Sequence, residues 1–346
     1  LLSAFLRPGQ ESVVDIVYQH RQRSRGPKVV VIGGGTGLST LLRGMKEYTS
    51  NISAIVTVAD DGGSSGRLRR ELGVLPPGDF RNCIAALADA ESLMTQLFQY
   101  RFSEGISLDG HCFGNLFIAA MAGITGNFER AILESGRVLA VQGLILPSTL
   151  ENVTLCADLR EEEDITAEGL SQIEGESQIS QMDKPIERVF LRPEHVRAYP
   201  GALKAILEAD LVVIGPGSLY TSILPNLLVE DIAKALRASR AVKVYICNVA
   251  TQPGETEQFS VADHVEALEH HIGKGVFRHV IVNDNFDIEP PSHWTTTELV
   301  PLIYPAGGSY EILTADLIDP SCPWRHHSGK LARFLMDFYH AQQNAR

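Results

Sequence analysis

The segment from Lys28 to Gly37 reads KVVVIGGGTG and decides the fold of this 346-residue chain. Its apolar, β-branched run, residues 29–32, ends in a glycine turn, and an apolar helical pattern begins at Leu38. A buried parallel strand that leads through a glycine turn into a helix is how a nucleotide-binding α/β unit begins. Glycine tolerates positive φ in such a turn, and the missing Cβ lets backbone N–H groups approach a phosphate. The segment therefore predicts an α/β fold with an anion site where this strand ends.

The turn matches neither of two common nucleotide-binding loops. Leu38 stands where the third glycine of the dinucleotide fingerprint belongs, and no Gly-Lys-Ser/Thr follows as in a P-loop. A tight strand-to-helix turn without a ligand is the alternative. Because four glycines and a threonine exceed what a turn requires, we favour an anion site.

Composition narrows the classes of function. A net charge of −12 argues against a sequence-independent nucleic-acid binder, which needs a basic face. The five cysteines are widely spread and show no metal-like spacing with histidine, so we expect reduced thiols in a cytoplasmic protein and no metal site. No run of 18 apolar residues is present, so we expect no membrane span. Residues 1–27 mix arginines with apolar residues, which fits a solvated helix or a juxtamembrane segment tethered upstream of Leu1.

A second group of polar residues follows the next expected strand, residues 52–59. It reads DDGGSSGR from Asp60 to Arg67. Open α/β sheets bind ligands at the carboxyl ends of their strands, where an acidic residue accepts a ribose or substrate hydroxyl. We therefore favour a binding loop in which Arg67 faces phosphate oxygens, over a solvated Gly/Ser loop with no ligand.

Two further helices are expected to begin at polar residues. Asp79 is placed to cap a helix over residues 80–87, yet Arg81 in its first turn opposes the helix dipole. An anionic ligand nearby would resolve that conflict. Asn115 opens another apolar helix, where a ligand contact and a cap or buried amide are equally open interpretations.

The middle of the chain changes character. Residues 137–191 contain short strand-like runs, including residues 144–146, without helical periodicity, which predicts an antiparallel β insertion or lid. The α/β pattern then resumes with a strand over residues 211–214 and a second glycine turn, where Ser218 is placed to cap a helix. A helix over residues 224–236 is expected to follow. We expect a Rossmann-like, mostly parallel sheet with helices on both faces, over residues 28–346, and a ligand across its carboxyl edge.

In this order, the motifs resemble those of the YvcK-like gluconeogenesis factors, a branch of the family that also holds CofD, the 2-phospho-lactate transferase of deazaflavin cofactor synthesis. The resemblance runs from Lys28 to about Arg333 and includes GGGTGLS from Gly33, PPGDFRN from Pro76, and IGPGSLYTS from Ile214. It implies a UDP-sugar ligand such as UDP-N-acetylglucosamine, and a regulatory role that links carbon metabolism to cell-wall synthesis and cell shape. It also implies that Arg325, which precedes His-x-x-x-Lys, contacts that ligand, with Trp294 and Tyr304 as candidates for an aromatic partner.

Two hypotheses follow. The first is a UDP-sugar-binding regulator without turnover, which we expect to be a homo-oligomer with protein partners in cell-wall synthesis. The second is a CofD-like transferase in which Asp60 or Asp61 binds Mg²⁺ or deprotonates an acceptor hydroxyl. The transferase branch has Pro-Asp-x-Asp-Thr where this chain has PPGDFRN, which disfavours the second. An NAD-dependent enzyme is the third and weakest interpretation. The expected ligand-binding residues are Gly33, Gly34, Gly35, Thr36, Gly37, Asp60, Asp61, Gly62, Gly63, Ser64, Ser65, Arg67, Asp79, Arg81, Asn82, Asn115, Gly217, Ser218, Tyr220, Thr221, Asn248, Thr251 and Arg325.

Overall fold

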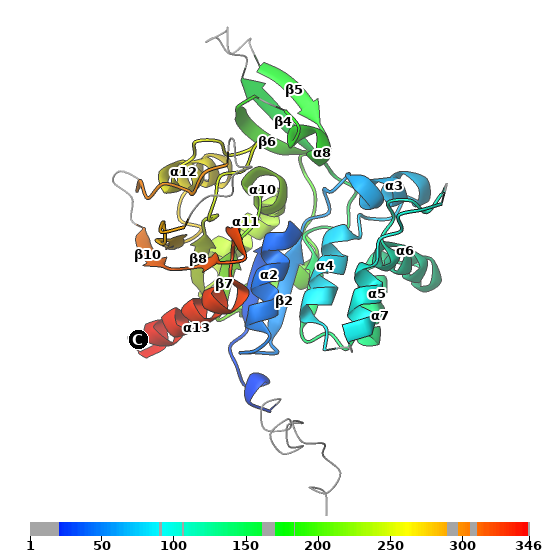
Figure 1. Cartoon of the computed structure of the whole chain (residues 1–346), viewed down its shortest axis with the longest axis horizontal. Helices are drawn as coiled ribbons and strands as arrows, with labels where there is room; N and C mark the ends of the chain where they lie inside the picture. The colour runs from blue at the N-terminus through cyan, green and yellow to red at the C-terminus, as the bar shows by residue number, and fades with distance from the viewer. Residues whose placement is uncertain are drawn as a thin grey trace, which may run out of the picture.

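The centre of the protein is a seven-stranded, all-parallel sheet (Figure 1). The computed structural model describes residues 21–89, 92–105, 107–160, 170–182, 184–288, 297–304 and 310–344. The strands lie in the order β10-β9-β8-β7-β1-β2-β3. Their bounds are β1 (Val29–Gly33), β2 (Ile52–Val56), β3 (Leu144–Pro147), β7 (Leu211–Ile214), β8 (Val242–Ile246), β9 (His279–Asn283) and β10 (Glu311–Ala315).

The strand order places a topological switch point between β1 and β7. From β1 the chain moves through α2 (Gly35–Met45) to β2, whereas from β7 it moves the other way through α11 (Glu230–Ala238) to β8. Because such crossovers are right-handed, the two helices fall on opposite faces of the sheet. The Rossmann-like fold class is confirmed, and the crevice outside the switch point is where sheets of this kind bind ligands.

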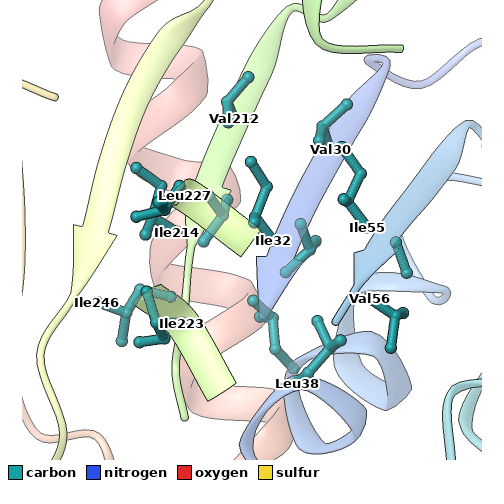
Figure 2. Close-up of a cluster of buried hydrophobic side chains, with 14 of the residues drawn as sticks. Val30, Ile32, Leu38, Ile55, Val56, Val212, Ile214, Ile223, Leu227 and Ile246 are labelled. Carbon is teal, nitrogen blue, oxygen red and sulfur yellow. The ribbon is translucent and has the colours of Figure 1, made fainter. Parts of the chain in front are cut away.

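The central strands are apolar along their whole length because both faces of the sheet are covered. Figure 2 shows Val30, Ile32 and Ile55 beside Val212 and Ile214, all at most 2% exposed. This packing fixes the strand ends, and the glycine turns that follow them, in a rigid frame.

The remaining helices surround this sheet. They are α3 (Gly63–Leu72), α4 (Gly78–Leu87), α5 (Ser92–Gln99), α6 (Phe113–Thr125), α7 (Phe128–Val138), α8 (Glu176–Ile179), α9 (Pro200–Glu208), α10 (Leu224–Leu227), α12 (Val261–Ile272) and α13 (Ser328–Asn344). The C-terminal helix α13 packs across α2, and a Cβ on Gly44 would overlap the Ser328 carbonyl oxygen. Within the described ranges, no helix has the length and apolar character needed to cross a membrane. Residues 1–20, which hold most of the expected juxtamembrane segment, lie outside the described residues.

A small antiparallel sheet stands apart from the parallel one, in the order β5-β4-β6. Its strands are β4 (Thr154–Arg160), β5 (Leu170–Glu174) and β6 (Ile186–Arg192), and Figure 1 shows them together with α8 at one end of the molecule. Leu144–Pro147, which the sequence analysis grouped with this insertion, is instead the edge strand of the parallel sheet, paired with β2. The run is too short for its periodicity to distinguish the two settings.

Three local predictions were wrong. The Gly/Ser run after Asp61 is the first turn of α3, with Gly62 as its N-cap, rather than a loop. The expected helix over residues 224–236 is divided into α10 and α11, with a π-helical segment, Leu219–Ile223, before it. Asp79 does not cap its helix, because α4 begins earlier, at Gly78, with Pro77 as the N-cap residue.

Candidate functional site

A cleft of about 490 Å³ lies at the carboxyl edge of the sheet, at the switch point between β1 and β7. Four segments form most of it: the turn after β1, the turn after β7, the loop after β8 and a C-terminal hairpin. Thr297 adds one further lining residue. The structure thus brings together residues that lie nearly 300 positions apart in the chain. The predicted site residues that line it are Gly34, Gly35, Thr36, Gly37, Gly217, Ser218, Asn248, Thr251 and Arg325.

The first glycine turn presents the N-terminus of α2 to the cleft. Gly34 is the N-cap residue and makes no side-chain cap, and among the first N–H groups of α2 that of Gly35 donates to the Asp79 carboxylate. The first N–H groups of a helix have no intrahelical partner, and the helix dipole adds positive potential there. This end of α2 therefore has the donors and the polarity that bind a phosphate.

The two glycine turns pack directly on each other. A Cβ on Gly37 would lie 2.6 Å from the Pro216 carbonyl oxygen and 3.0 Å from the Cα of Gly217. Both neighbours are backbone atoms, which have little room to move. Glycine at position 37 is therefore what allows the two turns to lie against each other and line one continuous cleft.

The second turn is held by a buried carboxylate rather than by a helix cap. Glu255 accepts hydrogen bonds from the Tyr220 N–H at 3.2 Å and from the Thr221 hydroxyl at 2.7 Å. Ser218 was expected to cap a helix, but its side chain makes no capping hydrogen bond. Ser218 lines the cleft instead. Tyr220 and Thr221 are buried and do not line the cleft, so in this structure they shape the turn from behind.

Arg325 reaches the cleft from a hairpin of β11 (Ile318–Asp319) and β12 (Cys322–His326). It is exposed, and it forms no ion pair with any carboxylate of the described residues. An arginine fork without a carboxylate partner, in a cleft that also holds the N-terminus of α2 and the second glycine turn, fits a bidentate contact with an anion.

Partly buried carboxylates gather behind the first turn, and none of them lines the cleft. The mostly buried Asp79 accepts a hydrogen bond from the Gly35 N–H, and burial, aided by the charge of Asp60, raises its pKa to about 6. Burial also raises the pKa of Asp60, although the Gly62 N–H, at 2.9 Å, opposes this. Asp61 accepts the Ser177 N–H at 2.9 Å. Negative charge is therefore concentrated behind the first turn, next to the N-terminus of α2.

Glu176 joins these carboxylates from the antiparallel sheet's helix α8. Burial, together with the charges of Asp60, Asp79 and Glu255, raises its pKa well above the ordinary value. Its Oε2 atom has no hydrogen-bond partner among the described residues. Nevertheless, no group of three or more His, Cys, Asp or Glu side chains in the described ranges is arranged to hold a metal ion.

Comparison with known proteins now places the chain in a family. A family model described as 2-phospho-L-lactate transferase CofD matches residues 29–297. The chain belongs to the CofD family. It is 58% identical over 269 residues to a putative gluconeogenesis factor of Nostoc sp., covering 78% of this chain and 57% of that protein. It is 52% identical over 257 residues to the gluconeogenesis factor of Bacillus subtilis, covering 74% of this chain and 77% of that one.

A solved structure agrees with this family membership. A Bacillus halodurans protein described as a member of the UPF0052 family is 42% identical, with a TM-score of 0.81 over 90% of this chain and 99% of that chain. The resemblance to gluconeogenesis factors within the CofD family is thereby confirmed. This chain spans less than three fifths of the length of the Nostoc relative and of a 54% identical relative from Clostridium acetobutylicum.

Several predicted site residues of this CofD-family chain lie outside the cleft, around α3, α4 and α6. Arg67 donates to the Asp109 carbonyl at 2.7 Å, and Arg81 donates to Gln99 and Asn82 at 3.0 and 2.9 Å. The others there are Gly62, Gly63, Ser64, Ser65 and Asn115. Gly33 also lies outside the cleft, and its carbonyl accepts a hydrogen bond from Asn226 at 3.0 Å. Their roles as ligand contacts stay predictions.

Trp324 is a cleft residue that the sequence analysis missed. It lines the cleft beside Arg325 and is 37% exposed. Of the two aromatic candidates, Trp294 lies outside the described residues, and Tyr304 is exposed but does not line the cleft. The available signal was the position of Trp324 directly before the arginine that the resemblance already singled out.

The raised pKa of Asp79 makes a testable prediction about stability. Its pKa is about 6 in the folded protein and near 3.8 when unfolded, so ionisation opposes folding increasingly from pH 4 to 6. Asp79→Asn removes that penalty. We therefore expect the variant's free energy of unfolding, relative to the parent's, to rise by about 2.4 kcal/mol between pH 4 and pH 7.5. Urea denaturation at both pH values measures this, with the exposed Asp337→Asn as the control. A difference that does not change with pH would contradict it.

Proposed function

We propose that this protein binds a UDP-sugar, with UDP-N-acetylglucosamine as the first candidate, and acts as a regulator without turning it over. The observation that carries the proposal is the convergence of two glycine turns and Arg325 on one cleft. Two strand-to-helix turns side by side suit a diphosphate, because each turn can bind one phosphoryl group through backbone N–H donors.

The regulatory role is proposed from the family relationship. Relatives at about half identity are named gluconeogenesis factors, and the resemblance adds a link between carbon metabolism, cell-wall synthesis and cell shape. A homo-oligomer and protein partners in cell-wall synthesis are part of this proposal. A cytoplasmic location is proposed as well, and the free state of all five cysteines is consistent with a reducing compartment.

Calorimetry with UDP-N-acetylglucosamine, with and without Mg²⁺, tests the proposal when the recovered nucleotide is then analysed by chromatography. Micromolar binding without Mg²⁺, with the ligand recovered intact, is the expected result. Recovery of a cleaved nucleotide would overturn a regulator without turnover. Absence of binding, combined with binding of GDP or NAD under the same conditions, would overturn the ligand class.

A CofD-like transferase is the second candidate function, which would move a phospho-lactyl type group from a nucleotide diphosphate donor to an acceptor hydroxyl. The carboxylates behind the first turn favour it, because Asp60 or Asp61 could serve as a base or as an oxygen ligand of Mg²⁺. Mg²⁺-dependent turnover that is lost in Asp60→Asn would support this alternative.

The position of Trp324 leads to a separate prediction. If it stacks on the base, Trp324→Ala is expected to weaken UDP-N-acetylglucosamine binding by about five- to a hundredfold, the range for loss of one base–aromatic contact. Calorimetry measures this, and Tyr304→Ala is the matched aromatic control outside the cleft. Weaker binding in the Tyr304 variant alone would assign the stacking to that residue.

A further inference from the structure

The hairpin that brings Arg325 and Trp324 to the cleft has little structure of its own. β11 contains two residues, and only two pairs register it with β12, Ile318 with His326 and Asp319 with Cys322. An irregularity interrupts the register between them. Because a two-stranded ribbon is marginal in water, contacts outside the hairpin must fix its position.

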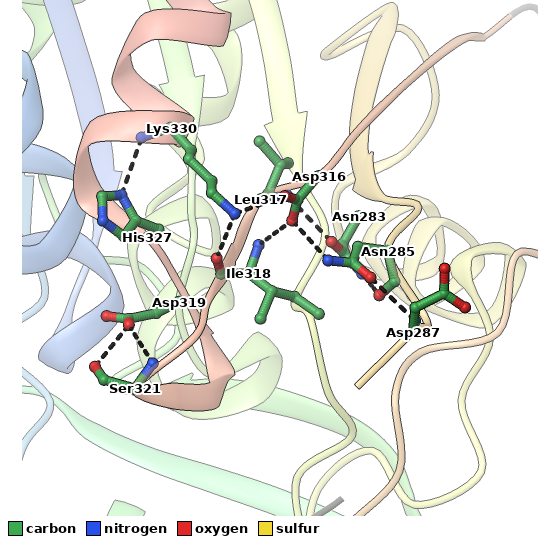
Figure 3. Close-up of polar contacts among 10 residues, drawn as sticks. All are labelled: Asn283, Asn285, Asp287, Asp316, Leu317, Ile318, Asp319, Ser321, His327 and Lys330. Atoms are coloured by element: carbon green, nitrogen blue, oxygen red, sulfur yellow. Dashed lines mark hydrogen bonds and ion pairs between the residues drawn. The ribbon is translucent and has the colours of Figure 1, made fainter. Parts of the chain in front are cut away.

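We propose that Lys330 is a positioning residue for ligand binding, which holds this hairpin in place through an ion pair with Asp316. The inference rests on the proposed function, because it names what orients Arg325. Lys330 lies in the first turns of α13, and its Nζ is 2.6 Å from the Asp316 Oδ2 and 3.1 Å from the Ile318 carbonyl oxygen (Figure 3). One ammonium group thus binds both Asp316, two residues before the hairpin, and Ile318, the first residue of the hairpin.

The other end of this contact is anchored in the parallel sheet. The second carboxylate oxygen of Asp316 accepts hydrogen bonds from the Asn285 side chain at 3.1 Å and from the Ile318 N–H at 3.4 Å. Asn283, the last residue of β9, accepts the Leu317 N–H at 3.2 Å. Lys330 therefore links the hairpin to the carboxyl ends of β9 and β10, as Figure 3 shows.

The helix that carries Lys330 is itself fixed to the first glycine turn. α13 packs on α2 at Gly44, and α2 begins at the turn that faces Arg325 across the cleft. His327 adds a second attachment, since its N–H donates to the Leu317 carbonyl at 2.7 Å. The two sides of the cleft are thereby connected through α13.

Lys330 does not line the cleft, so its effect on a ligand must be indirect. Its side chain is 35% exposed and that of Asp316 is 48% exposed, and an ion pair this exposed adds little to global stability. The inference therefore predicts weaker ligand binding with an almost unchanged melting temperature. If the ion pair had only a structural role, its removal would change neither the ligand affinity nor the melting temperature strongly.

Lys330→Met is the test variant, and UDP-N-acetylglucosamine is the probe. We expect a three- to thirtyfold loss of affinity, on the order that residues of a coupling network produce, while the melting temperature stays within about 2 °C. Lys330→Arg should restore most of the affinity. Arg333→Met is the matched control, because it removes another exposed ion pair of α13, with Asp337, that has no contact with the hairpin.

A double-mutant cycle separates positioning from a direct contact. If Lys330 acts through Arg325, then Lys330→Met has little further effect in an Arg325→Ala background. Additive losses in the cycle, or unchanged affinity in the single variant, would overturn the inference.

A measurement without ligand keeps the inference separate from the proposed function. Trp324 and Trp294 are the two tryptophans of the chain, so Trp294→Phe leaves Trp324 as the one reporter on the hairpin. Lys330→Met in this background should increase quenching by acrylamide and lower the fluorescence anisotropy, whereas Arg333→Met should not. If these changes occur but UDP-N-acetylglucosamine does not bind the parent protein, the proposed function fails and the positioning role stands. Unchanged fluorescence overturns the positioning role whatever the ligand result.

Discussion

Arg325→Ala is expected to weaken binding of UDP-N-acetylglucosamine by about ten- to a hundredfold, because a hydrogen bond between charged groups typically contributes about 1.5–3 kcal/mol. Arg325 lines the cleft opposite the glycine turns and forms no ion pair within the described ranges. Its removal should therefore act on the ligand rather than on the fold. Calorimetry measures the affinity, and thermal unfolding should show little change.

Two variants sharpen this test. Arg325→Lys keeps the positive charge but loses the planar fork, so an intermediate affinity is expected if the contact is bidentate. Arg278→Ala is the control, because Arg278 directly precedes β9 and thus lies at the amino edge of the sheet, opposite the cleft. Equal losses in Arg325→Ala and Arg278→Ala would mean that only the net charge matters.

Gly37→Ala is expected to lower both stability and binding. The new Cβ would lie 2.6 Å from the Pro216 carbonyl oxygen. Because that oxygen is a backbone atom, the clash can be relieved only if the two turns move apart. We expect a loss of about 3 kcal/mol in the free energy of unfolding, at the upper end of ordinary overpacking. Separation of the two turns should also reduce binding of a diphosphate below detection. Urea denaturation and calorimetry measure the two effects.

Gly123→Ala on α6 is the matched control for that substitution. A Cβ at this position meets nothing within 4 Å, so alanine should leave stability unchanged or raise it by up to about 1 kcal/mol through helix propensity. Binding should be unaffected. If Gly37→Ala behaved like Gly123→Ala, close contact of the two turns would not be needed for the site.

The sequence was sufficient to predict the sheet but not its edges. Val29–Gly33 and Leu211–Ile214 are uniformly apolar because both their faces are buried, and such runs are easily recognised. Leu144–Pro147 is an equally apolar run, but it lies in a stretch without helical periodicity and was therefore grouped with the antiparallel strands that follow it. Glu311–Ala315, the other edge strand, was not predicted, because its residues are all partly exposed.

The parts of the candidate site that directly follow the end of a strand could be predicted from the sequence. The parts at which distant segments of the chain meet could not. The turns at Gly34 and Gly217 could be placed at one edge by the rules of parallel sheets. The sequence could not show that Asp79 packs behind the first turn without lining the cleft, because this depends on a helix that begins at Gly78 and turns that side chain toward Gly35. It also could not show that α8 brings Glu176 to the same carboxylates, because that contact depends on how the antiparallel sheet packs.

The pairing of β1 with β7 has a consequence for synthesis on the ribosome. Val29 is paired with Leu211, so about 180 further residues must be synthesised after β1 before its partner strand β7 is available. At a translation rate of about 5–20 residues per second, that interval is roughly 10–40 s. During it the apolar run that leads into the glycine turn has β2 and β3 on one side and no partner on the other. An unpaired apolar strand is prone to aggregation. The nascent chain is therefore expected to need a chaperone until Ile214 has left the exit tunnel, and the cleft cannot form before then.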